Sequence, residues 1–160
     1  MGAVVDLHLH TTVSDGRLTP TELIQLVARQ GLKVVSVSDH DITDGLAEAY
    51  QALKEFPDMR LIPGLELSTD IPGDEIHMLG YFIQYGDDEF QGILSRFREG
   101  RLERGQAMVQ KLAEYGLHIE WERVREISGY GSVGRPHIAL ALVERGYFKE
   151  PKDAFAEYLG

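Results

Sequence analysis

The sequence predicts an α/β fold in its first half and a helical unit in its second half. Two observations carry this prediction. Short apolar runs rich in Val, Ile and Leu alternate with amphipathic segments up to residue 86, and after that point only helical patterns follow. Polar side chains also gather where the apolar runs end, as they do in α/β folds. We therefore expect a strand-bearing domain at 1–86 and a helical subdomain at 87–160.

The first half reads as strands that alternate with helices. Pro20 lies near the start of the first helix and Gly31 follows its end, which is typical of helix boundaries. The expected strands are 3–8, 33–38, 60–67 and 76–83, and the expected helices are 19–30 and 43–56. The order β-α-β-α-β-β predicts a largely parallel sheet of about four strands.

The second half contains helical patterns interrupted by glycine. Breaks at Gly116, at 129–134 and at Gly146 separate these patterns. The expected helices are 89–115, 121–127, 135–145 and 151–158. This half is therefore expected to form a helical unit without further βα repeats.

Composition limits the chemistry and the partners. The chain of 160 residues contains no cysteine, so any metal must be bound by imidazole, carboxylate or water, and a cytoplasmic location is expected. The net charge of −10 disfavours binding to long duplex DNA or anionic lipid. No apolar run approaches the roughly 20 residues of a membrane span, and no export signal begins the chain. We expect no membrane association.

The first strand carries two histidines on one face. Side chains alternate along a strand, so Asp6, His8 and His10 project to the same side in the run VVDLHLH. Polar groups in a row reduce the burial of the strand unless a ligand binds them. The alternative is a pair of exposed histidines on an edge strand.

The next two loops add acidic and imidazole groups. Asp15 lies in the run Ser-Asp-Gly, where it is either a ligand or a turn former. Asp39 and His40 end the second strand; His40 is expected to bind metal, and Asp39 to hold a ligand ring or to bind metal itself. Asp41 and Asp44 are expected to cap the following helix.

Glu66 and His77 belong to the third and fourth strands. A lone carboxylate in an apolar strand is costly to bury, so we expect a metal or an arginine beside Glu66. A carboxylate can bridge two cations, which an imidazole cannot do. His77 is either a ligand or a hydrogen-bonded core histidine. The joint pattern of these residues at strand ends predicts a polynuclear metal site.

The motifs DLHLHTTVSDG, VSVSDHDITDG, PGLELS and EIHMLGY resemble the PHP (polymerase and histidinol phosphatase) family of metal-dependent phosphoesterases. The branch that the chain resembles acts on nucleotide 3',5'-bisphosphates and on the 5' ends of short oligonucleotides. The run SVGRPHIALALVERGY is similar to the histidine motif in the helical insertion of that branch. The resemblance covers nearly the entire chain.

This resemblance implies a trinuclear centre in a distorted seven-stranded β/α barrel, of which the chain holds a part with a helical insertion. One cation would be held by His8 and His10, a second by Glu66 as a bridge with His77 and His137, and a third by Asp15 and His40. Mn, Fe or Zn would suit this set of ligands.

The chain departs from the family pattern at its end. Family members continue to a His-Pro motif and a terminal Asp-x-His pair, and this sequence ends at AFAEYLG before either. A β/α barrel needs ~200 residues or more, so we expect a fragment or a short form that lacks about three strands. Fewer metals and weak or no turnover are then expected, unless a second chain completes the rim. Unpaired sheet edges make a homodimer plausible.

The expected reaction is hydrolysis of a phosphate monoester by a metal-bridging hydroxide, with Asp39 and His40 as catalytic residues. Arg101 and Arg104 on the long helix and Arg135 before Pro136 are expected to bind substrate phosphate. The alternative for the long helix is a solvated face that pairs its arginines with Glu99 and Glu103. His118 lies apart from the motifs and is expected to be structural.

Two other functions remain open. Amidohydrolase-type enzymes also begin with His-x-His on the first strand, but they usually use a ligating lysine on a middle strand, where this sequence has Glu66. The chain could also be a non-catalytic module whose metal site stabilises the fold or an interface.

Overall fold

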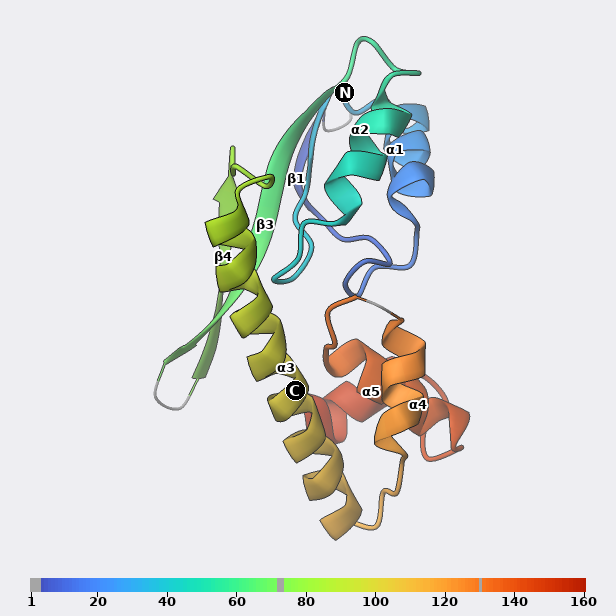
Figure 1. Cartoon of the computed structure of the whole chain (residues 1–160). Coiled ribbons are helices and arrows are strands. Elements are labelled where there is room, and N and C mark those ends of the chain that lie inside the picture. Colours follow the sequence, from blue (N-terminus) through green and yellow to red (C-terminus); the bar gives the residue numbers. More distant parts are fainter. Residues whose placement is uncertain (1–3, 72–73, 130) are drawn as a thin grey trace. The chain divides into compact units, whose positions relative to one another are not determined.

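The computed structural model describes residues 4–71, 74–129 and 131–160 (Figure 1). The chain divides into two compact units, Met1–Phe97 and Arg98–Gly160. This division lies inside helix α3 (Asp88–Glu114), whereas the change from strands to helices lies just before that helix, where the sequence predicts a boundary.

The first unit is built on a four-stranded sheet in the order β1-β2-β3-β4. Its strands are β1 (Val5–Leu9), β2 (Val34–Val37), β3 (Arg60–Ile71) and β4 (Asp74–Tyr81). The α/β class and the four strands are confirmed; Ala3, where we expect the first strand to begin, lies outside the described residues.

The largely parallel sheet that we expect has one antiparallel strand, β4. β1 and β2 pair in parallel, as do β2 and β3, but β3 and β4 pair antiparallel. β3 ends at Ile71 and β4 begins at Asp74, and a connection this short can join only antiparallel strands. The result is a mixed sheet whose last two strands form a long hairpin.

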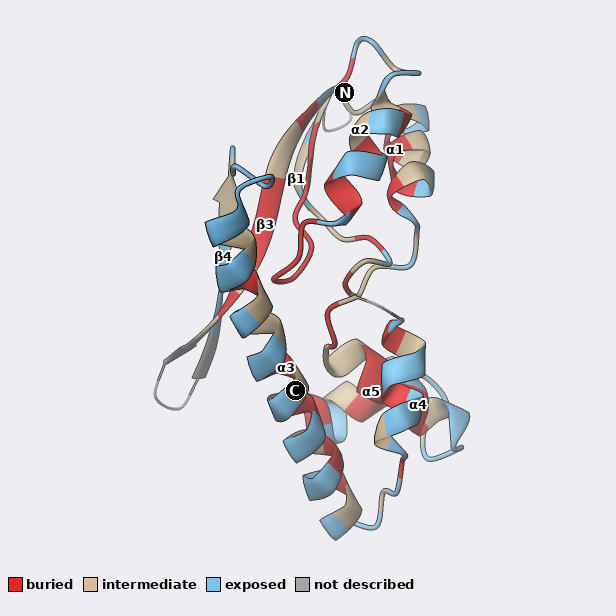
Figure 2. Ribbon diagram, in the orientation of Figure 1, coloured by how far each residue is buried: buried red, intermediate tan, exposed pale blue. Residues whose placement is uncertain are grey.

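Helices α1 (Pro20–Arg29) and α2 (Gly45–Leu53) lie side by side and pack on the sheet (Figures 1 and 2). Thr19 and Glu22 form a capping box at the start of α1, because each side chain accepts the backbone N–H of the other residue. The core of this unit comprises Leu23, Ile24, Val27, Val35, Val37, Leu46, Ala49, Ala52, Met59 and Leu61. This packing fixes the carboxyl ends of β1 and β2, from which the candidate site is built.

The second unit is helical. It contains α3 from Arg98 onward, α4 (Trp121–Ser128), α5 (Arg135–Glu144), α6 (Pro151–Ala154) and a π-helical turn η1 (Phe155–Leu159). Val124, Ile138 and Leu142 lie at the centre of its core. Arg123 on α4 donates to both carboxylate oxygens of Glu144 on α5, at 2.8 and 2.9 Å. None of the described helices has both the length and the apolar character needed to cross a bilayer.

Gly64 marks a close approach between β3 and β2. A methyl group at this position would overlap the Ser36 hydroxyl and lie 3.0 Å from the carbonyl oxygen of Val37. Glycine therefore allows β3 to reach the rim next to β2, two residues before Glu66.

We expect Gly64→Ala to destabilise the protein by about 1–3 kcal/mol, because the added methyl group overpacks the sheet. Urea unfolding followed by circular dichroism measures this change. Gly92→Ala is the matched control, because Gly92 lies on an exposed helical position with open space around it and should be neutral or stabilising. Equal stability of Gly64→Ala and the parent chain would contradict the close approach.

Candidate metal centre

Side chains from all four strands of the first unit meet at one rim of the sheet. His8 lies on β1 and His10 directly follows it, His40 lies just beyond β2, Glu66 lies on β3 and His77 on β4. An isolated parallel bridge between His40 and Glu66 continues the pairing of β2 and β3 to this point. The rim thus gathers groups that are up to about seventy residues apart in sequence. His8, His10 and His40 lie at the carboxyl ends of parallel strands, and the antiparallel strand β4 adds His77.

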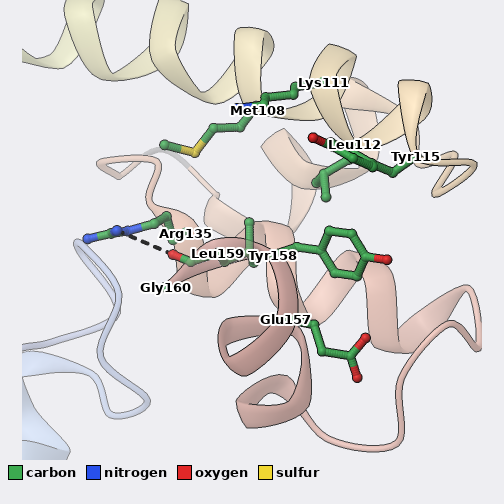
Figure 3. A pocket seen from close by; sticks show the side chains of 9 residues that line it. All are labelled: Met108, Lys111, Leu112, Tyr115, Arg135, Glu157, Tyr158, Leu159 and Gly160. Atoms are coloured by element: carbon green, nitrogen blue, oxygen red, sulfur yellow. Dashed lines mark hydrogen bonds between the residues drawn. The ribbon is translucent and has the colours of Figure 1, made fainter. Parts of the chain in front are cut away.

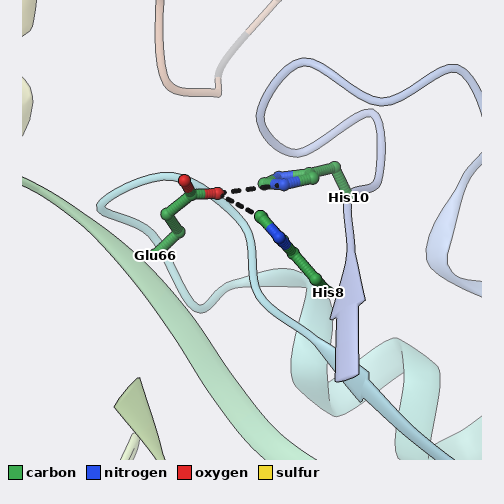
Figure 4. A group of neighbouring side chains, drawn as sticks. All are labelled: His8, His10 and Glu66. Atoms are coloured by element: carbon green, nitrogen blue, oxygen red, sulfur yellow. Dashed lines mark hydrogen bonds and ion pairs between the residues drawn. The ribbon is translucent and has the colours of Figure 1, made fainter. Parts of the chain in front are cut away.

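The Glu66 carboxylate is the centre of this cluster. It is only 4% exposed, and its Oε2 atom lies 2.7 Å from His8 Nε2 and 3.1 Å from His10 Nε2 (Figure 4). Its Oε1 atom lies 2.8 Å from His77 Nδ1. The two oxygens therefore face different imidazoles, which is the arrangement that a bridging carboxylate requires.

Asp15 supplies a second carboxylate to the cluster. Its Oδ1 atom lies 3.5 Å from His10 Nδ1, and its Oδ2 atom lies 3.6 Å from His40 Nε2. His40 Nε2 also lies 3.7 Å from Glu66 Oε2. These three separations are longer than ordinary hydrogen-bond distances.

The imidazole rings follow one another around the rim. Ring centroids are 4.9 Å apart for His8 and His10, 4.8 Å for His10 and His40, and 4.8 Å for His40 and His77. His10 Nδ1 is buried and makes no hydrogen bond within the described part of the chain. A buried nitrogen without a hydrogen-bond partner is costly unless a ligand binds it.

The donor set fits divalent cations. Three overlapping groups each bring their ligand atoms within 4.8 Å of one another: His8, His10 and Glu66; His10, Asp15 and His40; and His40, Glu66 and His77. Mixed nitrogen and oxygen donors suit Mn, Fe and Zn. Mg and Ca prefer oxygen ligands alone, so they are a poorer match to this set. The six expected ligands of the first unit thus lie together in one cluster.

Asp39 is buried next to His40 in sequence and belongs to none of the three ligand groups among the described residues. Its Oδ1 atom accepts hydrogen bonds from the Thr11 backbone at 2.7 Å and the Ser14 hydroxyl at 2.6 Å. Its Oδ2 atom accepts a third from the Thr11 hydroxyl at 2.7 Å. Burial raises the pKa of the Asp39 carboxyl, and the bonds from Ser14 and Thr11 act in the opposite direction.

Asp41 is the residue of this region that sequence reasoning missed. We expect it to cap α2, but the N-cap position is Asp44, whose side chain makes no capping hydrogen bond. Asp41 is instead fully buried, and its Oδ1 atom accepts the backbone N–H of Ser68 at 3.0 Å. The sequence signal for this contact with Ser68 was the run Asp39-His40-Asp41, in which two acidic residues flank a histidine.

The arginines expected to bind substrate lie in the second unit. Arg101 is 8% exposed and donates from Nη1 to the Val133 carbonyl at 3.2 Å. Arg101 is therefore not part of a solvated face of the long helix. Arg104 on the same helix is half-buried. Arg135 donates from Nη1 to the Leu159 carbonyl at 3.3 Å.

Arg135 also lines a cavity of about 410 Å3 in the second unit, together with Lys111, Tyr115 and Tyr158 (Figure 3). All of the lining residues of this cavity belong to the second unit.

His137 is buried in the first turn of α5. The Gly134 N–H donates to its Nδ1 atom at 2.9 Å. This bond leaves the proton of the neutral ring on Nε2, which makes Nε2 a donor. The exposed His118 lies on the segment between α3 and α4, apart from these groups.

The family model described as PHP domain matches residues 6–160, which is almost the whole chain. The chain belongs to the PHP domain family. This agrees with the motifs that end its strands, and the cluster around Glu66 is made from those motifs.

Two curated relatives and one solved structure illustrate the relationship. The chain is 35% identical over 161 residues to a 3',5'-nucleoside bisphosphate phosphatase of Chromobacterium violaceum, covering 98% of this chain and 55% of that protein. It is 32% identical over 157 residues to the 5'-3' exoribonuclease Rnm of Salmonella typhimurium, covering 98% and 54% respectively.

An amidohydrolase from Chromobacterium violaceum, solved with bound sulfate and no metal, matches with a TM-score of 0.88 at 33% identity, over 99% of this chain and 56% of that chain. This PHP domain chain therefore spans about 55% of the length of the relatives that it matches.

We expect Glu66→Ala to lower the affinity for Zn2+ or Mn2+ by at least about 100-fold, because it removes a ligand from two of the three groups. Isothermal titration calorimetry with metal-free protein measures the affinity, and elemental analysis gives the metal content. Glu55→Ala removes an exposed glutamate outside the cluster and should bind metal like the parent chain. Unchanged affinity in Glu66→Ala would contradict the central position of this carboxylate.

Proposed function

We propose that this PHP domain protein is a metal-dependent phosphoesterase that hydrolyses phosphate monoesters. One observation carries the proposal: a buried carboxylate, Glu66, contacts His8 and His10 through one oxygen and His77 through the other. A site with two or more adjacent cations can clamp the oxygens of a phosphoryl group on both sides.

The proposed ligands are the residues of the three overlapping groups. His8, His10 and Glu66 would hold one ion, Glu66, His40 and His77 a second, and His10, Asp15 and His40 a third. When bound, divalent cations lower the pKa of water to near neutrality and offset the charge on phosphoryl oxygens. Mn, Fe and Zn are the proposed metals, because all three accept imidazole together with carboxylate.

The protein side chains supply orientation and charge. Glu66 contacts the imidazoles of His8, His10 and His77. The Asp15 carboxylate adds negative charge 3.5 Å from His10 and 3.6 Å from His40. Because these groups are fixed before substrate arrives, little reorganisation accompanies the reaction. His40 is the proposed reactive-site histidine; it belongs to two of the three groups, as His10 does, and it is the more buried of the two rings.

The bond at Nδ1 makes His137 a poorer ligand than the histidines of the first unit. Coordination through Nε2 would require the ring proton to move to Nδ1, where it would face the Gly134 N–H. We therefore propose His137 as a hydrogen-bond donor from Nε2 in place of the metal ligand that the family resemblance implies.

The proposed substrates are nucleoside 3',5'-bisphosphates or the 5' ends of short oligoribonucleotides. The relatives named above are a 3',5'-nucleoside bisphosphate phosphatase and a 5'-3' exoribonuclease, and a structural relative was solved with bound sulfate, which has the tetrahedral shape of a phosphate group. Arg101, Arg104 and Arg135 are the proposed phosphate-binding residues, because guanidinium groups match phosphate oxygens in pairs.

We expect the protein loaded with Mn2+ to release phosphate from adenosine 3',5'-bisphosphate. Chelation should abolish the release, renewed addition of Mn2+ should restore it, and Glu66→Ala should lower kcat/KM by at least about 100-fold. Malachite green detection of phosphate measures the rate, and Glu55→Ala is the control.

A panel of amides and lactones run in parallel tests the amidohydrolase alternative. Hydrolysis of these compounds without phosphate release would contradict the proposal. So would a chelator-sensitive melting temperature in a protein that releases no phosphate with Mn, Fe or Zn, because that result identifies a metal-binding module without this activity.

A further inference from the structure

Two buried carboxylates flank His40 in the turn that follows β2. Asp39 is 2% exposed and Asp41 is 0% exposed, so both ionisable side chains are buried away from solvent. Neither carboxylate belongs to the three ligand groups formed by the described residues. Buried carboxylates need hydrogen-bond donors to offset the lost hydration. The donors that Asp39 and Asp41 use indicate what these two residues do in the structure.

Asp41 and its neighbours hold β3 at Glu66. The Asp41 N–H donates to the Glu66 carbonyl at 3.0 Å, and the Glu66 N–H donates to the Asp39 carbonyl at 3.2 Å. The Asp41 carboxylate adds a third bond by accepting the Ser68 N–H at 3.0 Å. The backbone on both sides of Glu66 is thereby fixed to the turn that carries His40.

The backbone of Asp41 itself adopts an uncommon conformation. Its φ of 55° lies in the left-handed region, which Gly, Asn and Asp enter more readily than other residues. This conformation lets one residue offer its N–H to Glu66 and its carboxylate to Ser68. A residue at this position therefore needs both a short side chain with an acceptor and tolerance of positive φ.

Asp39 fixes a second segment, the loop between His10 and Asp15, through hydrogen bonds that its carboxylate accepts. Its three donors come from Thr11 and Ser14, which directly follow His10 and directly precede Asp15. The carboxylate thus fixes the loop that carries two candidate ligands. A Cβ atom at Gly45 would lie 3.3 Å from Asp39 Oδ2, so the carboxylate is also closely packed from the α2 side.

We propose that Asp39 and Asp41 are positioning residues of the metal centre: Asp41 sets Glu66, and Asp39 sets the loop of His10 and Asp15. The proposal rests on the metal-binding part of the proposed function and requires no particular substrate. Groups that orient metal ligands typically change metal affinity by 10–100-fold when they are removed. Their effect comes from accepted hydrogen bonds and requires no bond from Asp39 or Asp41 to metal.

The test measures Zn2+ and Mn2+ affinity by competition with a chromophoric chelator in three variants. Asp41→Gly removes the carboxylate without backbone strain, and we expect its affinity to fall about 10–100-fold. Asp41→Asn keeps an acceptor oxygen and tolerates the same φ, so its affinity should stay within about 3-fold of the parent chain. Asp44→Gly removes an acidic residue of the same loop that makes no capping bond, and its affinity should not change.

Asp39→Asn extends the test to the other carboxylate. Its amide oxygen can accept from Thr11 and Ser14, so a positioning role predicts nearly unchanged affinity, whereas a ligand role predicts a loss. Circular dichroism and thermal melting of the metal-free proteins establish that each variant is folded, and affinity is compared between folded variants only.

Four results would overturn the proposal. The first three are unchanged affinity in Asp41→Gly, a loss in Asp41→Asn as large as that in Asp41→Gly, and an equal loss in Asp44→Gly. The fourth is a loss of affinity in folded Asp39→Asn, which would make Asp39 a ligand. Failure of the proposed function is a separate outcome. If the parent chain binds metal, releases no phosphate and still loses affinity on Asp41→Gly, the phosphoesterase proposal fails and the positioning roles stand.

Discussion

The contact between the buried carboxylate of Glu66 and the surrounding imidazoles is the interaction on which the rest of this structure depends. A carboxylate that is 4% exposed loses most of its hydration, and this loss costs several kcal/mol unless opposite charge compensates it. Protonated imidazoles could supply that charge, but rings whose centroids are 4.8–4.9 Å apart would then repel one another. Divalent cations would compensate the carboxylates without that repulsion, and the donor groups of the cluster fit such ions.

The fold of the first unit brings the residues of this contact together. Parallel pairing of β1, β2 and β3 brings His8, His10, His40 and Glu66 to one rim, and the packing of α1 and α2 keeps the strands in register. The hairpin of β3 and β4 then adds His77, which pairs with Ser68 two residues beyond Glu66. Gly64 permits the close approach of β3 that places Glu66 at the rim.

Much of this could be predicted from the sequence, because the signals are local. Hydrophobic runs, Pro20, Gly31 and the glycine breaks mark where elements begin and end, and the candidate ligands stand where the runs end. The sequence did carry the direction of β4, and the parallel expectation overlooked it: only eight residues separate the expected strands 60–67 and 76–83, too few for the crossover that parallel strands need. The roles of Asp39 and Asp41 depend on donors from Thr11, Ser14 and Ser68, more than twenty residues away. The tautomer of His137 depends on a hydrogen bond at a helix start, which residue spacing does not reveal.

The central claim is that divalent cations bind at Glu66, and anomalous X-ray diffraction of crystals grown with Mn2+ tests it most directly. Data collected on both sides of the Mn absorption edge locate each ion and identify its element. The account predicts anomalous peaks about 2.0–2.3 Å from the carboxylate oxygens of Glu66 and from imidazole nitrogens of His8, His10 or His77. Crystals without a peak beside Glu66, in which the carboxylate keeps its direct bonds to the imidazoles, would contradict it.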